Sequence, residues 1–129
     1  MDTLLLEVAK ISQSYSKKTV VNNLSFGLNK GAIGCLLGPS GCGKTTVLRC
    51  IAGFEPIVGG EVLLNGVKVS SSEFSLQPEQ RHIGMVFQDY ALFPHLTVVS
   101  NIIFGLHYMS RKERSERAAE MLEIVGLKD

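Results

Sequence analysis

The first thirty residues contain two apolar segments that are typical of β-strands. Residues 3–11 (TLLLEVAKI) predict one strand, and residues 24–28 (LSFGL) predict a second, half-buried strand. Residues 19–21 (TVV) lead into the second strand, and residues 29–31 (NKG) after it form a turn signal. We therefore expect an antiparallel β layer in the N-terminal part of the chain.

Two continuous apolar runs, residues 32–37 (AIGCLL) and residues 83–87 (IGMVF), are typical of buried strands. Between them, residues 59–69 (GGEVLLNGVKV) predict a hairpin. Its alternating arms flank Asn65-Gly66, which is the strongest short turn signal in the chain.

Helical signals dominate the C-terminal part of the chain. Thr97 can cap a short helix over residues 98–105, and Ser110 with Glu113 fits a capping box that opens a second helix. This second helix is expected to end at Gly126. Its predicted apolar face consists of Ala118, Met121, Leu122 and Val125.

The segment 38–45 (GPSGCGKT) fits the pattern G-x-x-x-x-G-K-[ST] of phosphate-binding loops. The apolar run 32–37 precedes it, and a helical pattern over residues 45–52 follows it and ends at Gly53. A chance match in a chain of this length has a probability of about one per cent or less. We therefore predict that this loop binds a nucleotide.

The residue types of the loop explain how it would hold a polyphosphate. Its glycines allow successive N–H groups to point into one concavity, and Pro39 stiffens the loop. Lys44 is expected on the β- and γ-phosphates, Thr45 on Mg²⁺ and Thr46 on the α-phosphate. The predicted nucleotide-binding residues of the loop are Gly38, Pro39, Ser40, Gly41, Cys42, Gly43, Lys44, Thr45 and Thr46.

Tyr15 lies in a polar stretch, residues 12–18, and has two interpretations. The ring could cover a strand edge, or it could be a platform on which an adenine stacks. The phosphate loop downstream favours the platform. Val20 could form an apolar wall to the same base, although such a valine is more often an ordinary core residue.

Residues 88–96 (QDYALFPHL) form a predicted loop that is rich in aromatic and apolar side chains. Exposed apolar loops usually dock on another molecule, and the alternative is a loop folded onto its own core. His95 within it is a weak candidate for a ligand or a catalytic group.

Composition excludes several classes of protein. The chain has 129 residues, of which 45% are hydrophobic, and this suits one globular domain. A net charge of +1 gives no bulk electrostatic case for binding nucleic acid. We find neither a signal peptide nor an apolar run of ~18 residues that could span a membrane.

Cys35, Cys42 and Cys50 are expected to be reduced thiols, with Cys42 accessible and the other two in the core.

The order of these segments resembles the ATP-binding subunit of ATP-binding-cassette (ABC) importers. The motifs that carry the resemblance are Tyr15 (the adenine-stacking loop), residues 38–45 (the phosphate loop), Val86-Phe87-Gln88 (the Q-loop) and residues 92–98 with 101–102. Cys42 and the run 49–56 look most like those of importers of ferric iron and their sulfate, maltose and polyamine relatives. Ferric iron is therefore the first expectation for the solute.

The resemblance implies an α/β fold with a P-loop NTPase core and an N-terminal antiparallel β layer. Residues 1–88 would form this core up to the Q-loop, and residues 89–129 would begin a helical subdomain. ATP and Mg²⁺ are the implied ligands, with Lys44 and Gln88 in catalytic roles and Gln88 near Mg²⁺ together with Thr45.

The resemblance also implies partners and a location. Permease subunits in the membrane would dock near residues 88–98, a second ATP-binding subunit would complete the site, and a solute-binding protein would act indirectly. No nucleic acid is expected. The protein would lie peripherally at the cytoplasmic face of the cell membrane.

The family's L-S-G-G-Q signature, its Mg²⁺-binding Asp, its catalytic Glu and its switch His follow the segments present here. We therefore expect the N-terminal part of a longer subunit, in which hydrolysis by this chain alone is very slow or absent. Runs 32–37 and 83–87 would then lack the later strands that separate them in the family, and this favours self-association.

Two alternative functions remain open at this point. One is a non-hydrolysing nucleotide-binding module that regulates a partner. The other is a soluble cassette ATPase of translation or DNA repair, against which the segment 92–98 argues by resemblance alone.

Overall fold

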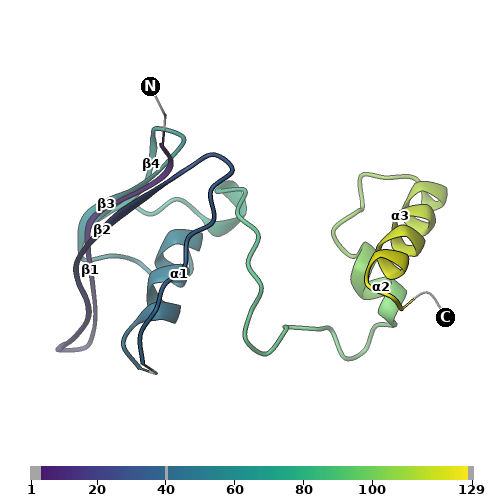
Figure 1. Ribbon diagram of the computed structural model, residues 1–129, viewed down its shortest axis with the longest axis horizontal. Helices are drawn as coiled ribbons and strands as arrows, with labels where there is room; N and C mark the ends of the chain where they lie inside the picture. Colours follow the sequence, from purple (N-terminus) through teal and green to yellow (C-terminus); the bar gives the residue numbers. More distant parts are fainter. Residues whose placement is uncertain (1–3, 40, 128–129) are drawn as a thin grey trace. The chain divides into compact units, whose positions relative to one another are not determined.

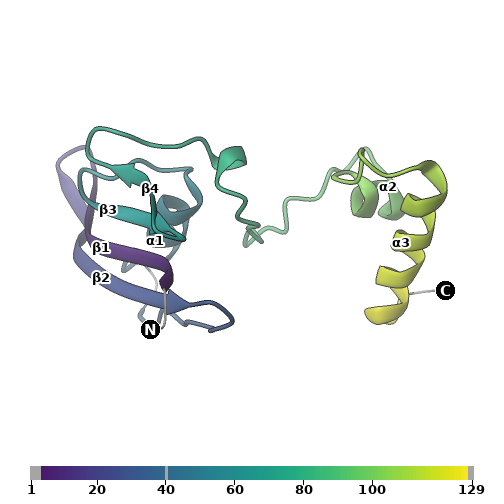
Figure 2. The ribbon, with the colours of Figure 1, turned by 90° about the horizontal axis from the view of Figure 1, so that it is seen from above.

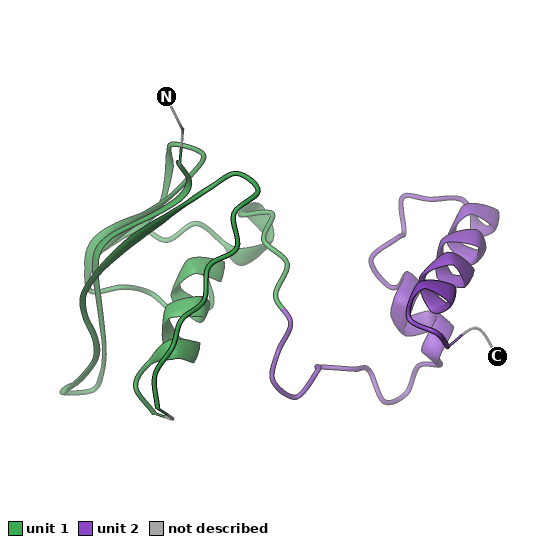
Figure 3. Cartoon of the chain, viewed as in Figure 1, with its two compact units in different colours: residues 1–85 green, residues 86–129 purple. Residues whose placement is uncertain are grey.

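The computed structural model describes residues 4–39 and 41–127 of the chain. These residues form two compact units, residues 1–85 and residues 86–129 (Figure 3), and each unit is considered by itself. Among the described residues, no helix combines the length and the apolar character needed to cross a bilayer.

The first unit contains a four-stranded antiparallel sheet with the strand order β2-β1-β3-β4 (Figure 2). The strands are β1 (Leu4–Tyr15), β2 (Lys18–Asn29), β3 (Gly59–Leu64) and β4 (Val67–Ser71). The predicted antiparallel layer is therefore confirmed. Both N-terminal strands are longer than the apolar alternation indicated, because hydrogen bonding continues through the polar residues beside the β1–β2 turn.

The β3–β4 hairpin turns where the sequence predicted it. Asn65 and Gly66 have φ values of 51° and 80°, so both lie in the left-handed region. Such a pair is the signature of the turn whose twist matches two right-twisted strands, and asparagine and glycine tolerate it best.

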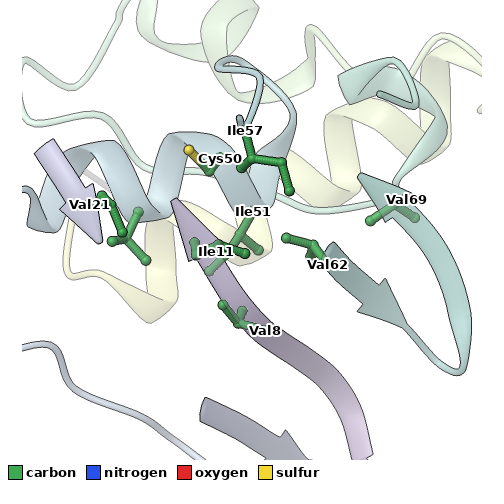
Figure 4. Close-up of a cluster of buried hydrophobic side chains, with 9 residues drawn as sticks. Val8, Ile11, Val21, Cys50, Ile51, Ile57, Val62 and Val69 are labelled. Atoms are coloured by element: carbon green, nitrogen blue, oxygen red, sulfur yellow. The ribbon is translucent and has the colours of Figure 1, made fainter. Parts of the chain in front are cut away.

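Helix α1 (Lys44–Ala52) covers one face of this sheet (Figure 1). Gly53 ends the helix with a φ of 96°, and its N–H donates to the Arg49 carbonyl oxygen, as expected for a glycine cap. Apolar side chains of α1 and of the strands point toward one another in the core (Figure 4). The core consists of Val8, Ile11, Val21, Val47, Cys50, Ile51, Ile57, Val62 and Val69.

The two continuous apolar runs do not form the predicted strands. Residues 32–37 and 83–87 have no regular secondary structure, and the side chains of Ile33, Leu37 and Val86 are 98%, 89% and 86% exposed. A strand needs a hydrogen-bonded neighbour, and no strand of the described residues pairs with either run. The prediction that these runs are buried strands is therefore wrong for this chain.

The second unit contains helices α2 (Val98–Ile103) and α3 (Arg111–Ile124), which pack on each other. The Thr97 hydroxyl accepts from the Ser100 N–H at 3.1 Å and caps α2, which ends two residues earlier than predicted. A 3-10 turn, η1 (Pro78–Gln80), belongs to the first unit.

The capping box at the start of α3 is confirmed. The Ser110 hydroxyl accepts from the Glu113 N–H at 3.2 Å, and the Glu113 carboxylate accepts from the Ser110 N–H at 2.9 Å. Ala118 is buried on the predicted apolar face, whereas Val125 lies beyond the helix and is 65% exposed. Gly126 follows with a φ of 77° and ends the helix as predicted.

Candidate nucleotide-binding site

The phosphate loop owes its shape to two glycines. Gly41 and Gly43 have φ values of 82° and 98°, in the region that side chains disfavour. The Cys42 N–H donates to the Pro39 carbonyl oxygen at 3.3 Å and closes a turn within the loop. A Cβ atom on Gly38 would lie 2.7 Å from the Cys42 sulfur, so the loop is also tight at its first glycine.

Helix α1 begins at this loop without a side-chain cap. Gly43 is its N-cap and provides no side chain to accept from the first turn, and this turn contains no acidic residue. The first N–H groups of a helix have no intrahelical partner, and they carry the positive end of the helix dipole. The arrangement therefore suits an anion such as a phosphate group.

The Lys44 side chain folds over the loop from the first position of α1. Its ammonium group donates to the carbonyl oxygen of Gly38 and, at 3.3 Å, to that of Pro39. The positive charge thus lies at the same loop as the first N–H groups of α1. A polyphosphate on these donors would also meet the ammonium group.

Thr45 and Thr46 differ in their access to a ligand. Thr45 is exposed in the first turn of α1, so its hydroxyl is available to a cation. Thr46 is only 9% exposed, and its contact with an α-phosphate stays a prediction. Mg²⁺ takes oxygen ligands and keeps several waters, so one hydroxyl plus phosphate oxygens fits it. The described residues contain no cluster of three or more His, Cys, Asp or Glu that could hold a metal ion alone.

Val20 of β2 lies against the start of α1. A Cβ atom on Gly43 would lie 3.0 Å from the Val20 carbonyl oxygen and 3.2 Å from its side chain. Val20 also lines a cavity of about 220 Å³ with Cys42, Gly43 and Lys44. The structure therefore places Val20 beside the loop, whereas its contact with a base stays a prediction.

Tyr15 ends strand β1, opposite Lys18, and its side chain is 44% exposed. The β1–β2 turn that follows it lies at the same end of the first unit as the loop before α1 (Figure 1). The ring is thus open to solvent, and its stacking on adenine stays a prediction.

The described structure does not test the roles predicted for Ser40, Gln88 and His95. Ser40 lies outside the described residues. Gln88 is exposed in a turn of the second unit, so its approach to Mg²⁺ stays a prediction. His95 is exposed, and its ring lies edge-on to that of Phe93 at a centroid distance of 6.0 Å.

The apolar loop 88–96 is partly folded onto its own unit. The Phe93 ring packs on Phe104 with centroids 4.4 Å apart, whereas Tyr90 and Leu92 are 76% and 70% exposed. Asn101 of α2 holds the loop, because its side chain accepts from the Phe93 N–H at 2.9 Å and donates to three carbonyl oxygens. Sequence reasoning missed this role of Asn101.

Arg81 is a second residue that sequence reasoning missed. It is only 5% exposed, and its guanidinium group donates five hydrogen bonds, among them two to carbonyl oxygens in the last turn of α1. Burial lowers the pKa of Arg81, with an opposing contribution from Cys50. No local pattern in the sequence marks this arginine as buried.

Two of the three cysteines have the exposure that the sequence predicted, and Cys35 does not. All three are free thiols, and Cys50 is buried in the core. Burial raises the pKa of Cys50 to about 11, Glu55 adds to the rise and Arg81 opposes it. Cys42 is exposed, as expected, but Cys35 is exposed as well. The prediction of a core position for Cys35 is wrong, because the segment 32–37 pairs with no strand.

Comparison with known proteins identifies relatives of the chain. A family model described as "ABC transporter" matches residues 21–129. The spermidine/putrescine import ATP-binding protein PotA of Legionella pneumophila (strain Paris) is 45% identical over 129 residues, which are 98% of this chain and 34% of that protein. PotA of Aliivibrio fischeri is 45% identical over 125 residues, or 95% of this chain and 32% of that protein.

A solved structure is also similar. It is a dimeric post-hydrolysis state of an ATP-binding cassette bound to ADP and Pi, with a TM-score of 0.78 and 28% identity. The match covers 92% of this chain and 56% of that one. The chain spans about a third of the length of the curated relatives that it matches.

Proposed function

The chain belongs to the ABC transporter family, and we propose that it forms the phosphate-binding part of the ATP-binding subunit of an importer. The observation that carries this proposal is the convergence of three features on one loop. They are the left-handed backbone of Gly41 and Gly43, the N-terminus of α1 without a side-chain cap, and the ammonium group of Lys44.

These residues would bind and orient the triphosphate of ATP. The N–H groups of the first turn of α1 face the anion, and Lys44 adds a full positive charge beside them. Thr45 would hold Mg²⁺, which neutralises charge on the phosphates when it is bound. In this proposal Gln88 reaches the same ion, and Tyr15 and Val20 contact the adenine.

We propose a polyamine as the transported solute. The curated relatives named above are spermidine/putrescine import ATP-binding proteins, and they do not support the expectation of ferric iron as the solute. In the proposed assembly a second ATP-binding subunit completes the site, and permease subunits dock on residues 88–98. The protein then lies at the cytoplasmic face of the membrane.

A non-hydrolysing regulatory module is the less favoured alternative. The curated relatives are named as import ATP-binding proteins, and the solved relative holds ADP and Pi after hydrolysis. Both descriptions favour an ATPase that drives transport.

Uptake by cells tests this proposal. The protein at its natural length replaces the chromosomal copy, and uptake of radiolabelled spermidine and of ferric citrate is compared between the parent, Lys44→Ala and Lys30→Ala. Lys30 is exposed in the turn after β2 and serves as the matched control. We expect Lys44→Ala alone to abolish spermidine uptake. Unchanged spermidine uptake in Lys44→Ala would contradict the proposal, and loss of ferric citrate uptake alone would reassign the solute.

A further inference from the structure

The guanidinium group of Arg81 joins segments that are far apart in the sequence. It donates to the carbonyl oxygens of Cys50 at 3.2 Å and Ile51 at 3.1 Å, both in the last turn of α1. It also donates to the Val69 carbonyl oxygen of β4 at 2.9 Å. Two further bonds go to the Leu76 carbonyl oxygen at 2.8 Å and the Ser75 hydroxyl at 3.1 Å. One side chain thus ties α1, β4 and the loop after β4 together.

These partners suit a buried cation. The last carbonyl oxygens of a helix lack intrahelical donors and carry the negative end of the helix dipole. A guanidinium group offers five N–H donors in a planar fork, and all five hydrogen bonds of Arg81 go to oxygen atoms. The carbonyl oxygens in the last turn of α1 therefore offset part of the free-energy cost of burying the positive charge of Arg81.

The end of α1 is itself shaped to admit this side chain. Gly53 follows the helix with a φ of 96°, and a Cβ atom there would lie 2.7 Å from Arg81 Nε and 3.0 Å from its Cζ. A glycine at this position thus serves two purposes, the left-handed cap and the close approach of the guanidinium group.

Arg81 occupies a particular place in the chain. The first turn of α1 carries Lys44 and Thr45, and the last turn of the same helix accepts from Arg81. Arg81 stands seven positions before Gln88 and directly precedes the segment 82–88. Helix α1 has nine residues, about two and a half turns, so intrahelical hydrogen bonds join its first turn directly to its last turn.

We propose that Arg81 is a positioning residue that couples α1 to the segment 82–88. Phosphate binding at the first turn of α1 would fix the helix, and Arg81 would pass this restraint to the residues that lead to Gln88. Arg81 itself contacts no nucleotide in this account. The inference rests on the proposed binding of ATP to the phosphate loop.

Hydrogen–deuterium exchange of the peptide 82–88, with and without Mg·ATP, tests the coupling in the protein at its natural length. Arg81→Lys keeps the charge but loses the planar fork. Ser75→Ala removes one acceptor and keeps the arginine. Val62→Ala removes buried apolar atoms from the core and should lower stability, but it leaves every hydrogen bond of Arg81 in place. It is therefore the control for a loss of stability alone.

We expect ATP to slow exchange of this peptide by about tenfold in the parent and in Val62→Ala. Arg81→Lys should still bind ATP but lose this protection, and Ser75→Ala should lose part of it. Full protection in Arg81→Lys, or an equal loss in Val62→Ala, would overturn the proposal. If Arg81→Lys does not fold, unchanged protection in Ser75→Ala would overturn it.

The failure of the proposed function gives a different result. If the parent protein binds no ATP, the proposed nucleotide site is contradicted. The role of Arg81 is then tested by hydrogen–deuterium exchange of the segment 82–88 in the absence of nucleotide. We expect Ser75→Ala to exchange faster than Val62→Ala within residues 82–85. Equal exchange in these two variants would show that Arg81 does not position the segment.

Discussion

Val20 and Gly43 lie close together, with the Val20 carbonyl oxygen only 3.0 Å from where a Cβ atom of Gly43 would lie. Val20 belongs to β2 of the antiparallel sheet, and Gly43 is the residue from which α1 begins. The sheet and the phosphate loop thus meet at a point where a side chain on residue 43 would press on β2. A φ of 98° at Gly43 adds a second reason for glycine.

Gly43→Ala is expected to damage both stability and binding. The left-handed backbone costs an alanine roughly 1–2 kcal/mol, and the Cβ atom also presses on Val20. We expect a lower free energy of unfolding in urea and weaker binding of ATP. Gly105→Ala is the control, because that position has open space and no positive φ. Equal effects of the two substitutions would contradict the tight fit at Gly43.

Tyr15→Ala is expected to weaken ATP binding by roughly 1–3 kcal/mol through lost stacking on the adenine. Inorganic triphosphate has no base, so its binding should not change. Tyr15→Phe keeps the ring and should bind ATP like the parent. If ATP and triphosphate lose affinity equally in Tyr15→Ala, the ring is not the adenine platform.

Ser110→Ala is expected to destabilise α3. The substitution removes the acceptor for the Glu113 N–H, and loss of an N-cap costs about 0.5–2 kcal/mol. Thermal unfolding followed by circular dichroism measures this loss. Ser72→Ala, at an exposed loop position, should leave the melting temperature unchanged. A melting temperature for Ser110→Ala equal to that of the parent would show that the capping box contributes nothing.

Cys50 should make stability fall in alkaline solution. Burial raises its pKa from 9.0 to about 11 in the folded protein, so the folded state holds the thiol proton more tightly than the unfolded state. This contribution is complete below pH 9 and is lost as the pH rises to 11. We expect urea denaturation to show a steeper loss of stability over this range in the parent than in Cys50→Ala. The same pH dependence in both proteins would contradict the raised pKa.

Signals confined to a few neighbouring residues predicted the structure well. The Asn65-Gly66 turn, the Gly53 cap and the capping box of Ser110 each depend on contacts within about one turn of chain, and all three are present. The left-handed φ values of Gly41 and Gly43 in the phosphate loop belong to the same class, because they follow from the local pattern.

Contacts between distant segments could not be predicted in this way. The apolar runs 32–37 and 83–87 have the composition of strands, but composition does not supply the neighbouring strand that hydrogen bonding requires. Arg81 likewise depends on carbonyl oxygens 31 and 12 positions away, at Cys50 and Val69. Only the folded chain brings these oxygens around one side chain.

Calorimetric titration of the natural-length protein with Mg·ATP tests the nucleotide site most directly. Lys44→Ala removes the ammonium group that lies over the loop, and we expect its affinity for ATP to fall by at least about tenfold, or 1.4 kcal/mol. Lys30→Ala, at the exposed turn after β2, should bind ATP like the parent. Equal affinities of Lys44→Ala and the parent would contradict the assignment of this loop as the phosphate site.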